Sequence, residues 1–187
     1  MKKIMLMLMT VLGFLMSFSN GFADEKTNNN KKVLVAYFSA TGNTKRVAQM
    51  INSNINSDIF EIVPATPYTN NDLNYNNSNS KTSKERADKT IRPAIKNKID
   101  LSKYDVIFLG YPIWWGEAPR IVSTFIENNN LNGKIIVPFV TSGSSGIGSS
   151  AKELTQLTKG ATWKDGRRFG SNSSNDEIKK WINSLGL

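Results

Sequence analysis

Short apolar runs alternate with stretches of helical periodicity along most of this chain, and this alternation is what most limits its possible folds. Strands separated by helices favour a parallel α/β sheet over an antiparallel meander. The most continuous apolar run predicts a central strand, and the most alternating one predicts an edge strand. In chain order, the predicted strands are residues 32–38, 58–63 (the edge strand), 105–113 (the central strand), 134–141 and a weakly marked fifth within 160–170.

Helix signals fall between these strands. Val47, Ile51 and Ile55 recur every four residues after the first strand, as on one face of a helix. Pro119 is predicted in the first turn of a later helix. Capping-box patterns start at Thr82, Ser150 and Ser174, and the Asn-rich residues 64–81 are predicted to be a surface loop. This β-α order can form one open sheet with helices on both faces.

The N-terminal residues have the pattern of a secretory signal peptide. Two lysines precede an apolar run that ends near Phe18, and small residues follow up to Ala23. The run is short for a membrane span, although an anchor that stays attached is the alternative. We expect a signal peptide at residues 1–23, a flexible leader at 24–31 and one domain at 32–187. The mature protein is then expected in an exported bacterial compartment, periplasmic or extracellular, with no stable membrane insertion.

The composition excludes several kinds of chemistry. The chain contains no cysteine and no histidine, which removes thiol catalysis, Ser-His couples and the usual imidazole metal ligands. Without Lys2 and Lys3, 22 basic and 15 acidic residues leave a net charge of +7, which favours anionic ligands or partners. No dense basic run is interleaved with aromatics, so nucleic-acid binding is not expected. We therefore predict no metal site and a bound cofactor that carries any chemistry.

Three unusual loops follow the first, third and fourth predicted strands. The carboxyl ends of parallel strands lie at one edge of the sheet, and ligands of open α/β sheets bind there, where the strand order reverses. We therefore expect these loops to meet. They are SATGNT at residues 39–44, YPIWWGEAP at 111–119 and TSGSSGIGSS at 141–150.

The first loop combines hydroxyl and amide side chains with one glycine at the start of a helix. A glycine permits a tight turn, and the free N–H groups of a helix N-terminus bind phosphate without a cation. The lysine of a nucleoside-triphosphate loop is missing, which disfavours a triphosphate. A capped strand-to-helix turn is the alternative reading. The candidate phosphate ligands are Ser39, Thr41, Gly42, Asn43 and Thr44.

The other two loops carry features that suit a flat ring. Trp114 and Trp115 stand side by side, and a planar ligand stacked on one of them would explain large aromatics beyond a buried strand. They could instead pack over the sheet edge or against a partner protein. The glycines of the third loop let the backbone approach a ligand closely, although a flexible linker is the alternative.

Together, the three loops resemble those of the flavodoxin family, including its secreted and membrane-associated branch. SATGNT resembles the family's phosphate-binding pattern, YPIWWGEAP its ring-flanking loop and TSGSSGIGSS its third flavin loop. The resemblance implies a three-layer α/β sandwich with a five-stranded parallel sheet in the order 2-1-3-4-5. It also implies non-covalent FMN, with the phosphate held by the first loop. The ring would lie against Pro112, Ile113, Trp114, Trp115 and Gly116, with Thr141, Ser142, Gly143 and Gly146 at its polar side.

The resemblance leaves more than one function open. An electron carrier for an exported compartment would exchange electrons with a redox partner protein or a quinone-like acceptor. An FMN-dependent NAD(P)H or quinone oxidoreductase is the enzymatic alternative, in which Tyr68 and Arg86 would touch a substrate rather than lie on the surface. A flavin-binding module without redox turnover is the third class.

Overall fold

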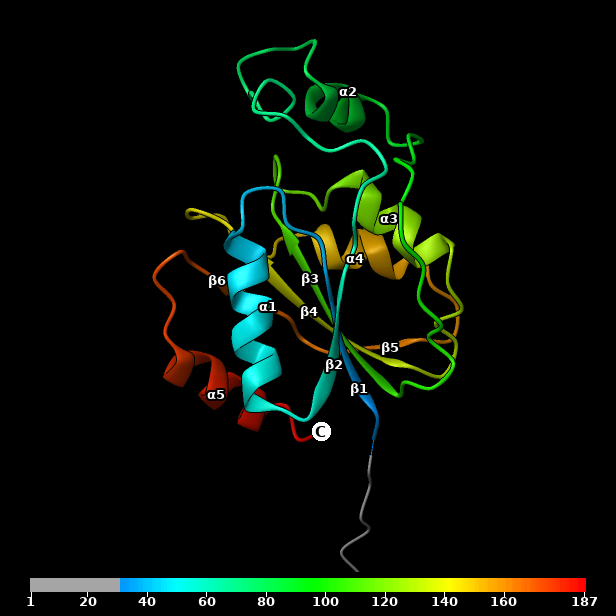
Figure 1. Cartoon of the computed structure of the whole chain (residues 1–187), viewed down its shortest axis with the longest axis vertical. Helices are drawn as coiled ribbons and strands as arrows, with labels where there is room; N and C mark the ends of the chain where they lie inside the picture. The colour runs from blue at the N-terminus through cyan, green and yellow to red at the C-terminus, as the bar shows by residue number, and fades with distance from the viewer. Residues whose placement is uncertain (1–30) are drawn as a thin grey trace, which may run out of the picture.

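The strands form one parallel sheet whose order confirms the expected topology. The structure, a computed structural model, describes residues 31–187, so the predicted signal peptide and almost all of the leader lie outside the described residues. The sheet order is β2-β1-β3-β4-β5, with β6 also paired to β4, and the order reverses between β1 and β3 (Figure 1). The strands are β1 (Val33–Tyr37), β2 (Ser57–Glu61), β3 (Val106–Pro112), β4 (Ile135–Thr141), β5 (Thr162–Trp163) and β6 (Arg167–Phe169).

The expected fifth strand is divided into two short strands, β5 and β6, which both pair with β4. The carbonyls of Lys134 and Ile136 accept 2.8 Å hydrogen bonds from the β5 side, so even-numbered residues of β4 face this neighbour. Pro138 is the next even-numbered residue and has no N–H to offer. The backbone at Gly166 also approaches closely, since an added Cβ there would lie 2.6 Å from the Pro138 carbonyl oxygen. The interruption therefore falls opposite Pro138.

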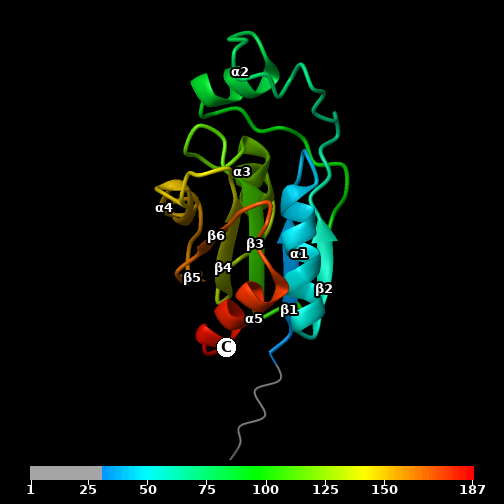
Figure 2. The same ribbon diagram turned by 90° about the vertical axis from the view of Figure 1, so that its left-hand side faces the viewer.

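Helices cover both faces of the sheet and complete the three layers (Figures 1 and 2). On one face, buried residues such as Val47, Phe108 and Trp181 join β1, β3 and β4 to α1 (Asn43–Asn54) and α5 (Asn175–Ser184). On the other, Leu109, Ile121 and their neighbours join the sheet to α3 (Arg120–Glu127) and α4 (Ser150–Thr155). Among residues 31–187, no helix is long and apolar enough to cross a membrane.

The helix starts differ from the sequence prediction at three of four places. The capping box at Ser174 is confirmed, because its side chain accepts a hydrogen bond from the Glu177 amide. The box expected at Ser150 is wrong by one residue: Ser149 is the N-cap, and the buried Ser150 hydroxyl bonds inward to Tyr111 at 3.1 Å. Pro119 is the N-cap of α3 rather than part of its first turn.

The box expected at Thr82 is also wrong, since α2 (Lys81–Ala87) has Ser80 as its N-cap. Thr82 and Glu85 are buried instead, and the Thr82 hydroxyl donates to the Asp72 carbonyl at 2.6 Å. Residues 62–105, between β2 and β3, carry α2 beyond the carboxyl ends of the strands in both views (Figures 1 and 2). We call this segment the β2–β3 excursion, and it lies over the sheet edge where the candidate site was expected.

Candidate functional site: a pocket at the carboxyl edge of the sheet

The loop after β1 turns sharply into α1. Gly42 is the N-cap of that helix and has a φ of 87°, a value that glycine adopts without strain. Its amide donates to the Ser39 hydroxyl oxygen at 3.1 Å, and its carbonyl accepts the first intrahelical bond from Arg46. No side chain caps α1. The N-terminus of α1, with its partial positive charge, therefore points toward the exposed side chains of Thr41 and Asn43.

Thr44 and Thr141 tie the first loop to the third. Both side chains are buried, and their hydroxyl oxygens share a hydrogen bond of 2.7 Å across 97 residues of sequence. This bond fixes the start of α1 against the end of β4, at the edge where the strand order reverses. It also engages the Thr44 hydroxyl, so Thr44 supports the loop from behind rather than presenting its side chain to a ligand.

A pocket of about 450 Å³ opens where the three loops meet, and we call it the edge pocket. Its polar end is formed by the β1–α1 loop and its apolar wall by the end of β3. Three lining residues come from regions that sequence reasoning did not assign to the site, namely the β2–β3 excursion and the segment after β6. The pocket is lined by Thr41, Asn43, Leu73, Tyr75, Pro112, Ile113, Trp114, Thr141, Ser142, Gly143 and Ser171.

Six predicted site residues do not line this pocket. Ser39, Gly42 and Thr44 shape the first loop as described above. Trp115 and Gly116 lie in the turn after β3, and Gly146 lies farther along the third loop, where an added Cβ would meet nothing within 4 Å. The structure thus brings together eight of the predicted side chains and places the others around them.

The two tryptophans occupy different environments because a tight turn separates them. Trp114 and Glu117 exchange backbone hydrogen bonds of 3.0 and 2.9 Å, and the two residues between them both have positive φ, 50° at Trp115 and 82° at Gly116. This is the conformation of a type I′ turn. As a result the side chains of Trp114 and Trp115 diverge. The adjacency of two tryptophans in the sequence gave no indication of this.

Trp114 belongs to the core and not to an exposed platform. Its exposed fraction is only 9%, and its ring packs edge-on against Phe38 and Tyr68 at centroid distances of 5.7 and 5.3 Å. Trp115 is half-buried and packs against Tyr75 at 4.4 Å, with the Arg86 guanidinium 5.5 Å from its ring. The expectation that both rings stand outside the core is therefore wrong for Trp114, whose buried ring forms part of the pocket wall.

Arg168 of β6 holds the third loop in place, a role that sequence reasoning missed. Its guanidinium donates to the carbonyls of Ser142, at 2.9 Å, and Gly143, and to the Ser142 hydroxyl at 3.3 Å. Three contacts from one planar group fix the loop in a way that a lysine could not reproduce. The loop is therefore an anchored wall of the edge pocket, which disfavours its interpretation as a flexible linker.

Behind Trp114, a buried carboxyl extends the polar network into the excursion. Glu85 is 3% exposed, and the Tyr68 hydroxyl lies 3.0 Å from both of its carboxyl oxygens. Burial raises the pKa of Glu85 above that of a free glutamate, and the Tyr68 hydrogen bond opposes this effect. Burial beside Glu85 also raises the pKa of Tyr68, so the phenol stays protonated and acts as the donor.

This raised pKa predicts a stability contribution that depends on pH. The folded state binds a proton on Glu85 more tightly than the unfolded chain, so stability falls as pH rises from the unfolded pKa through the folded one. Glu85→Gln removes this dependence. In urea unfolding at a series of pH values, wild type should lose stability relative to Glu85→Gln between acidic and neutral pH. A constant difference between the two proteins would contradict the assignment.

Comparison with known proteins places this chain in a family. A profile described as Flavodoxin matches residues 32–185. The crystal structure of a protein assigned as a flavoprotein from Bacteroides eggerthii is 46% identical, with a TM-score of 0.80 over 84% of this chain and 99% of that one. A flavoprotein from Lactobacillus acidophilus, crystallised in complex with FMN, shares the fold at 22% identity and a TM-score of 0.65, over 84% of this chain and 99% of that one.

A curated relative is the flavodoxin-like domain-containing protein BilS of Clostridioides difficile (strain CD3). It is 27% identical over 140 residues, which cover 75% of this chain and 63% of the relative, so the chain spans less than two thirds of that protein. The family profile covers all three loops of the edge pocket and the whole sheet. This chain belongs to the flavodoxin family.

Proposed function

We propose that the edge pocket binds FMN, with the phosphate at the β1–α1 loop and the ring against the end of β3. The observation that carries this proposal is the meeting of a polar loop at a helix N-terminus with an apolar wall in one pocket of about 450 Å³. Sites for small organic ligands are commonly roughly 300–1,000 Å³ and mostly apolar with a few polar groups. The L. acidophilus relative, crystallised with FMN, supports the same choice of cofactor.

The donor set fits a phosphate monoester. The Thr41 hydroxyl and Asn43 amide lie beside the N-terminus of α1, and none of the residues that line the edge pocket is a lysine or arginine. A helix N-terminus with small polar side chains can bind one phosphate group without a cation. Ser142 and Gly143 supply peptide groups at the opposite wall, where the polar side of a ring would lie.

FMN would supply the transfer of one or two electrons, and the residues of this chain would bind and shield it. Ile113 and Pro112 give the ring an apolar surface, and Leu73 and Tyr75 of the excursion cover another side of the pocket. Arg168 places a positive charge immediately behind the Ser142–Gly143 wall. Such a charge favours a negative charge on the bound ring and would raise its reduction potential.

For the biological role, we propose an electron carrier of the secreted flavodoxin-like branch that works in an exported compartment. The signal-peptide pattern at residues 1–23 supports this location. The carrier would exchange electrons with a redox partner protein or a quinone-like acceptor. An FMN-dependent NAD(P)H or quinone oxidoreductase remains the second candidate, favoured by the additional cavity that the excursion forms beside the edge pocket.

The first test is an FMN titration of the purified domain. Thr41→Val removes one hydroxyl from an exposed position, so the fold should persist while FMN affinity falls about tenfold or more, as expected for a hydrogen bond to a charged group. Riboflavin, which lacks the phosphate, should bind wild type and variant alike. Thr155→Val, on the exposed surface of α4, is the matched control. An equal loss for both flavins would place the phosphate elsewhere.

A second measurement separates the two roles. The FMN-loaded protein is mixed anaerobically with NADH or NADPH, and the flavin absorbance is followed. A carrier should be reduced slowly by either nucleotide and rapidly by chemical or protein donors. Rapid bleaching by a nicotinamide nucleotide would favour the reductase, and absence of any flavin binding would reject both roles.

A further inference from the structure

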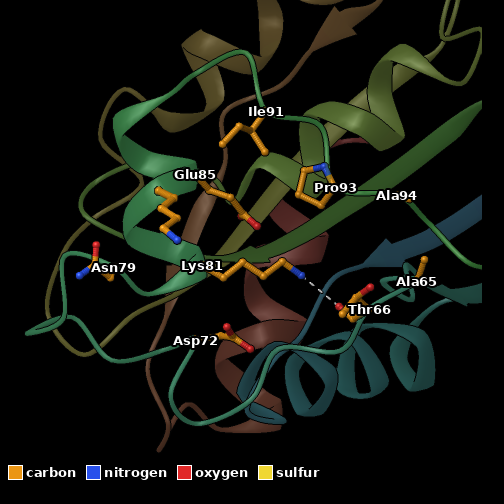
Figure 3. Close-up of a pocket in the computed structure, with 10 residues that line it drawn as sticks. Ala65, Thr66, Asp72, Asn79, Lys81, Glu85, Ile91, Pro93 and Ala94 are labelled. Atoms are coloured by element: carbon orange, nitrogen blue, oxygen red, sulfur yellow. Dashed lines mark hydrogen bonds between the residues drawn. The ribbon is translucent and has the colours of Figure 1, made fainter.

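A second cavity of about 450 Å³ lies within the β2–β3 excursion, and we call it the side pocket. It is open to solvent and lies between α2 and the two chain segments that lead into and out of the excursion (Figure 3). Nothing in the proposed binding of FMN uses this space. The pocket is lined by Ala65, Thr66, Asp72, Asn79, Lys81, Lys84, Glu85, Ile91, Pro93 and Ala94.

One part of the side pocket is built from ordered polar groups. The Lys81 ammonium donates to the Thr66 carbonyl at 3.1 Å and lies 4.0 Å from the centroid of the Tyr68 ring. The Glu85 carboxyl points toward the same space from the next turn of α2 (Figure 3). Glu85 is buried and bonded to Tyr68, so its position is fixed by the core and not by solvent. These groups form a prearranged set of donors and acceptors.

The remaining lining favours a neutral ligand that has both apolar surface and polar oxygens. Ile91, Pro93 and two alanines give the pocket an apolar side. Lys81 and Lys84 are matched by Asp72 and Glu85, so the pocket carries no formal excess of either charge. A charged ligand would gain little from such a lining, whereas an apolar ring with carbonyl oxygens can meet both the apolar side and the lysine donors.

Aromatic side chains connect the two pockets. Trp114 lines the edge pocket, and its ring lies 5.3 Å from that of Tyr68. The Tyr68 hydroxyl bonds to Glu85, which lines the side pocket. Phe38 packs against both rings at 5.6 and 5.7 Å and closes the cluster. A single wall of aromatic groups therefore separates the proposed flavin from the side pocket.

We propose that the side pocket binds a quinone, with its ring against Ile91 and Pro93 and its carbonyl oxygens toward the ammonium groups of Lys81 and Lys84. This inference rests on the proposed function where it concerns electron transfer. Reduced FMN would give two electrons to the quinone across the aromatic wall. Two protons from solvent would complete the hydroquinone, and the flavin would release its own ring protons to solvent as it is oxidised, so that electrons and protons balance.

The binding step can be tested without FMN. The flavin-free protein is titrated with menadione, a two-ring quinone, and backbone amide shifts are followed by NMR. We expect shifts centred on Lys81, Glu85 and Ile91. Ala94→Phe should fill the pocket, and Lys81→Met should remove a donor, each lowering menadione affinity at least tenfold. Lys96→Met, an exposed lysine outside the pocket, is the matched control and should bind as wild type does.

The outcomes separate this inference from the proposed function. FMN affinity should be unchanged in Ala94→Phe and Lys81→Met, because neither residue lines the edge pocket. Menadione shifts confined to Tyr75 and Trp114 would overturn the inference, because they would place the quinone in the edge pocket. Unaltered menadione affinity in both variants would also overturn it. Side-pocket binding by a protein that never takes FMN would uphold the quinone site and reject the flavin role.

Discussion

Gly110→Val is expected to prevent stable folding, and Gly110→Ala to cost about 3 kcal/mol, the upper part of the range for overpacked cores. Gly110 lies in the central strand β3, directly across from Phe139 of β4. A Cβ at this position would lie 2.1 Å from the nearest Phe139 ring atom, where no side chain can fit. Phe139 is fully buried, so its ring cannot move away. Urea unfolding followed by circular dichroism measures both effects.

Two further variants test the cause of the Gly110 effect. Gly146→Ala adds the same methyl group where nothing lies within 4 Å, and its stability should stay within about 0.5 kcal/mol of wild type. Adding Phe139→Leu to Gly110→Ala makes room for the methyl group, so the double variant should lose less than the sum of the two single losses. Additive losses would show that the strand, and not the ring contact, requires glycine.

Trp114→Ala is expected to cost about 3–5 kcal/mol, the usual range for removal of a buried tryptophan. The reason is its position between Phe38 and Tyr68, where truncation leaves a cavity behind the edge pocket. Trp115→Ala removes an equally large side chain that is only half-buried, and should cost about 1 kcal/mol or less. The contrast between adjacent residues is measured by urea unfolding of the two variants.

Trp114→Phe keeps an aromatic ring in the cluster and should recover more than half of the loss. If Trp114→Ala were no more damaging than Trp115→Ala, the core position of Trp114 would be wrong. Flavin binding gives an independent readout, because Trp114 lines the edge pocket and Trp115 does not. At temperatures where both variants remain folded, Trp114→Ala should therefore weaken FMN binding more than Trp115→Ala.

The sequence predicted the sheet and much of the site because its signals there are local. Apolar runs mark β1, β3 and β4, and their order with the intervening helices leaves few topologies. Parallel strands then bring the loops that follow them to one edge. For this reason Thr41 and Asn43 could be expected beside Ser142 and Gly143, although about 100 residues separate the two loops.

The errors arise where a tertiary contact overrides a local pattern. The Thr82 and Ser150 hydroxyls fit capping boxes, yet each is used inside the protein, by the Asp72 carbonyl and by Tyr111. The type I′ turn that separates the two tryptophans places one of them at positive φ, a conformation that sequence pattern does not suggest for tryptophan. Tyr75 was not expected at the site because it lies in an Asn-rich stretch with the composition of a surface loop.

Arg168 could have been noticed only from the completed fold. Its partners are backbone carbonyls of the third loop. Every residue has a backbone carbonyl, so the amino-acid sequence does not indicate which ones accept hydrogen bonds from Arg168. The division of the fifth strand places β6 beside the end of β4, where that loop begins. In the sequence, only Pro138 indicates that strand pairing beside β4 is interrupted. It does not indicate which side chain lies next to the third loop.

The β2–β3 excursion contributes to both pockets, while the β1–α1 loop and the Thr44–Thr141 bond lie outside it. The residues proposed to hold the phosphate and the residues that line the side pocket therefore lie in separate parts of the chain. Transplanting residues 62–105 between relatives should move selectivity for the second molecule while the proposed phosphate contacts stay in place. Selectivity for a second molecule could then change through residues 62–105 alone, without any change in the sheet.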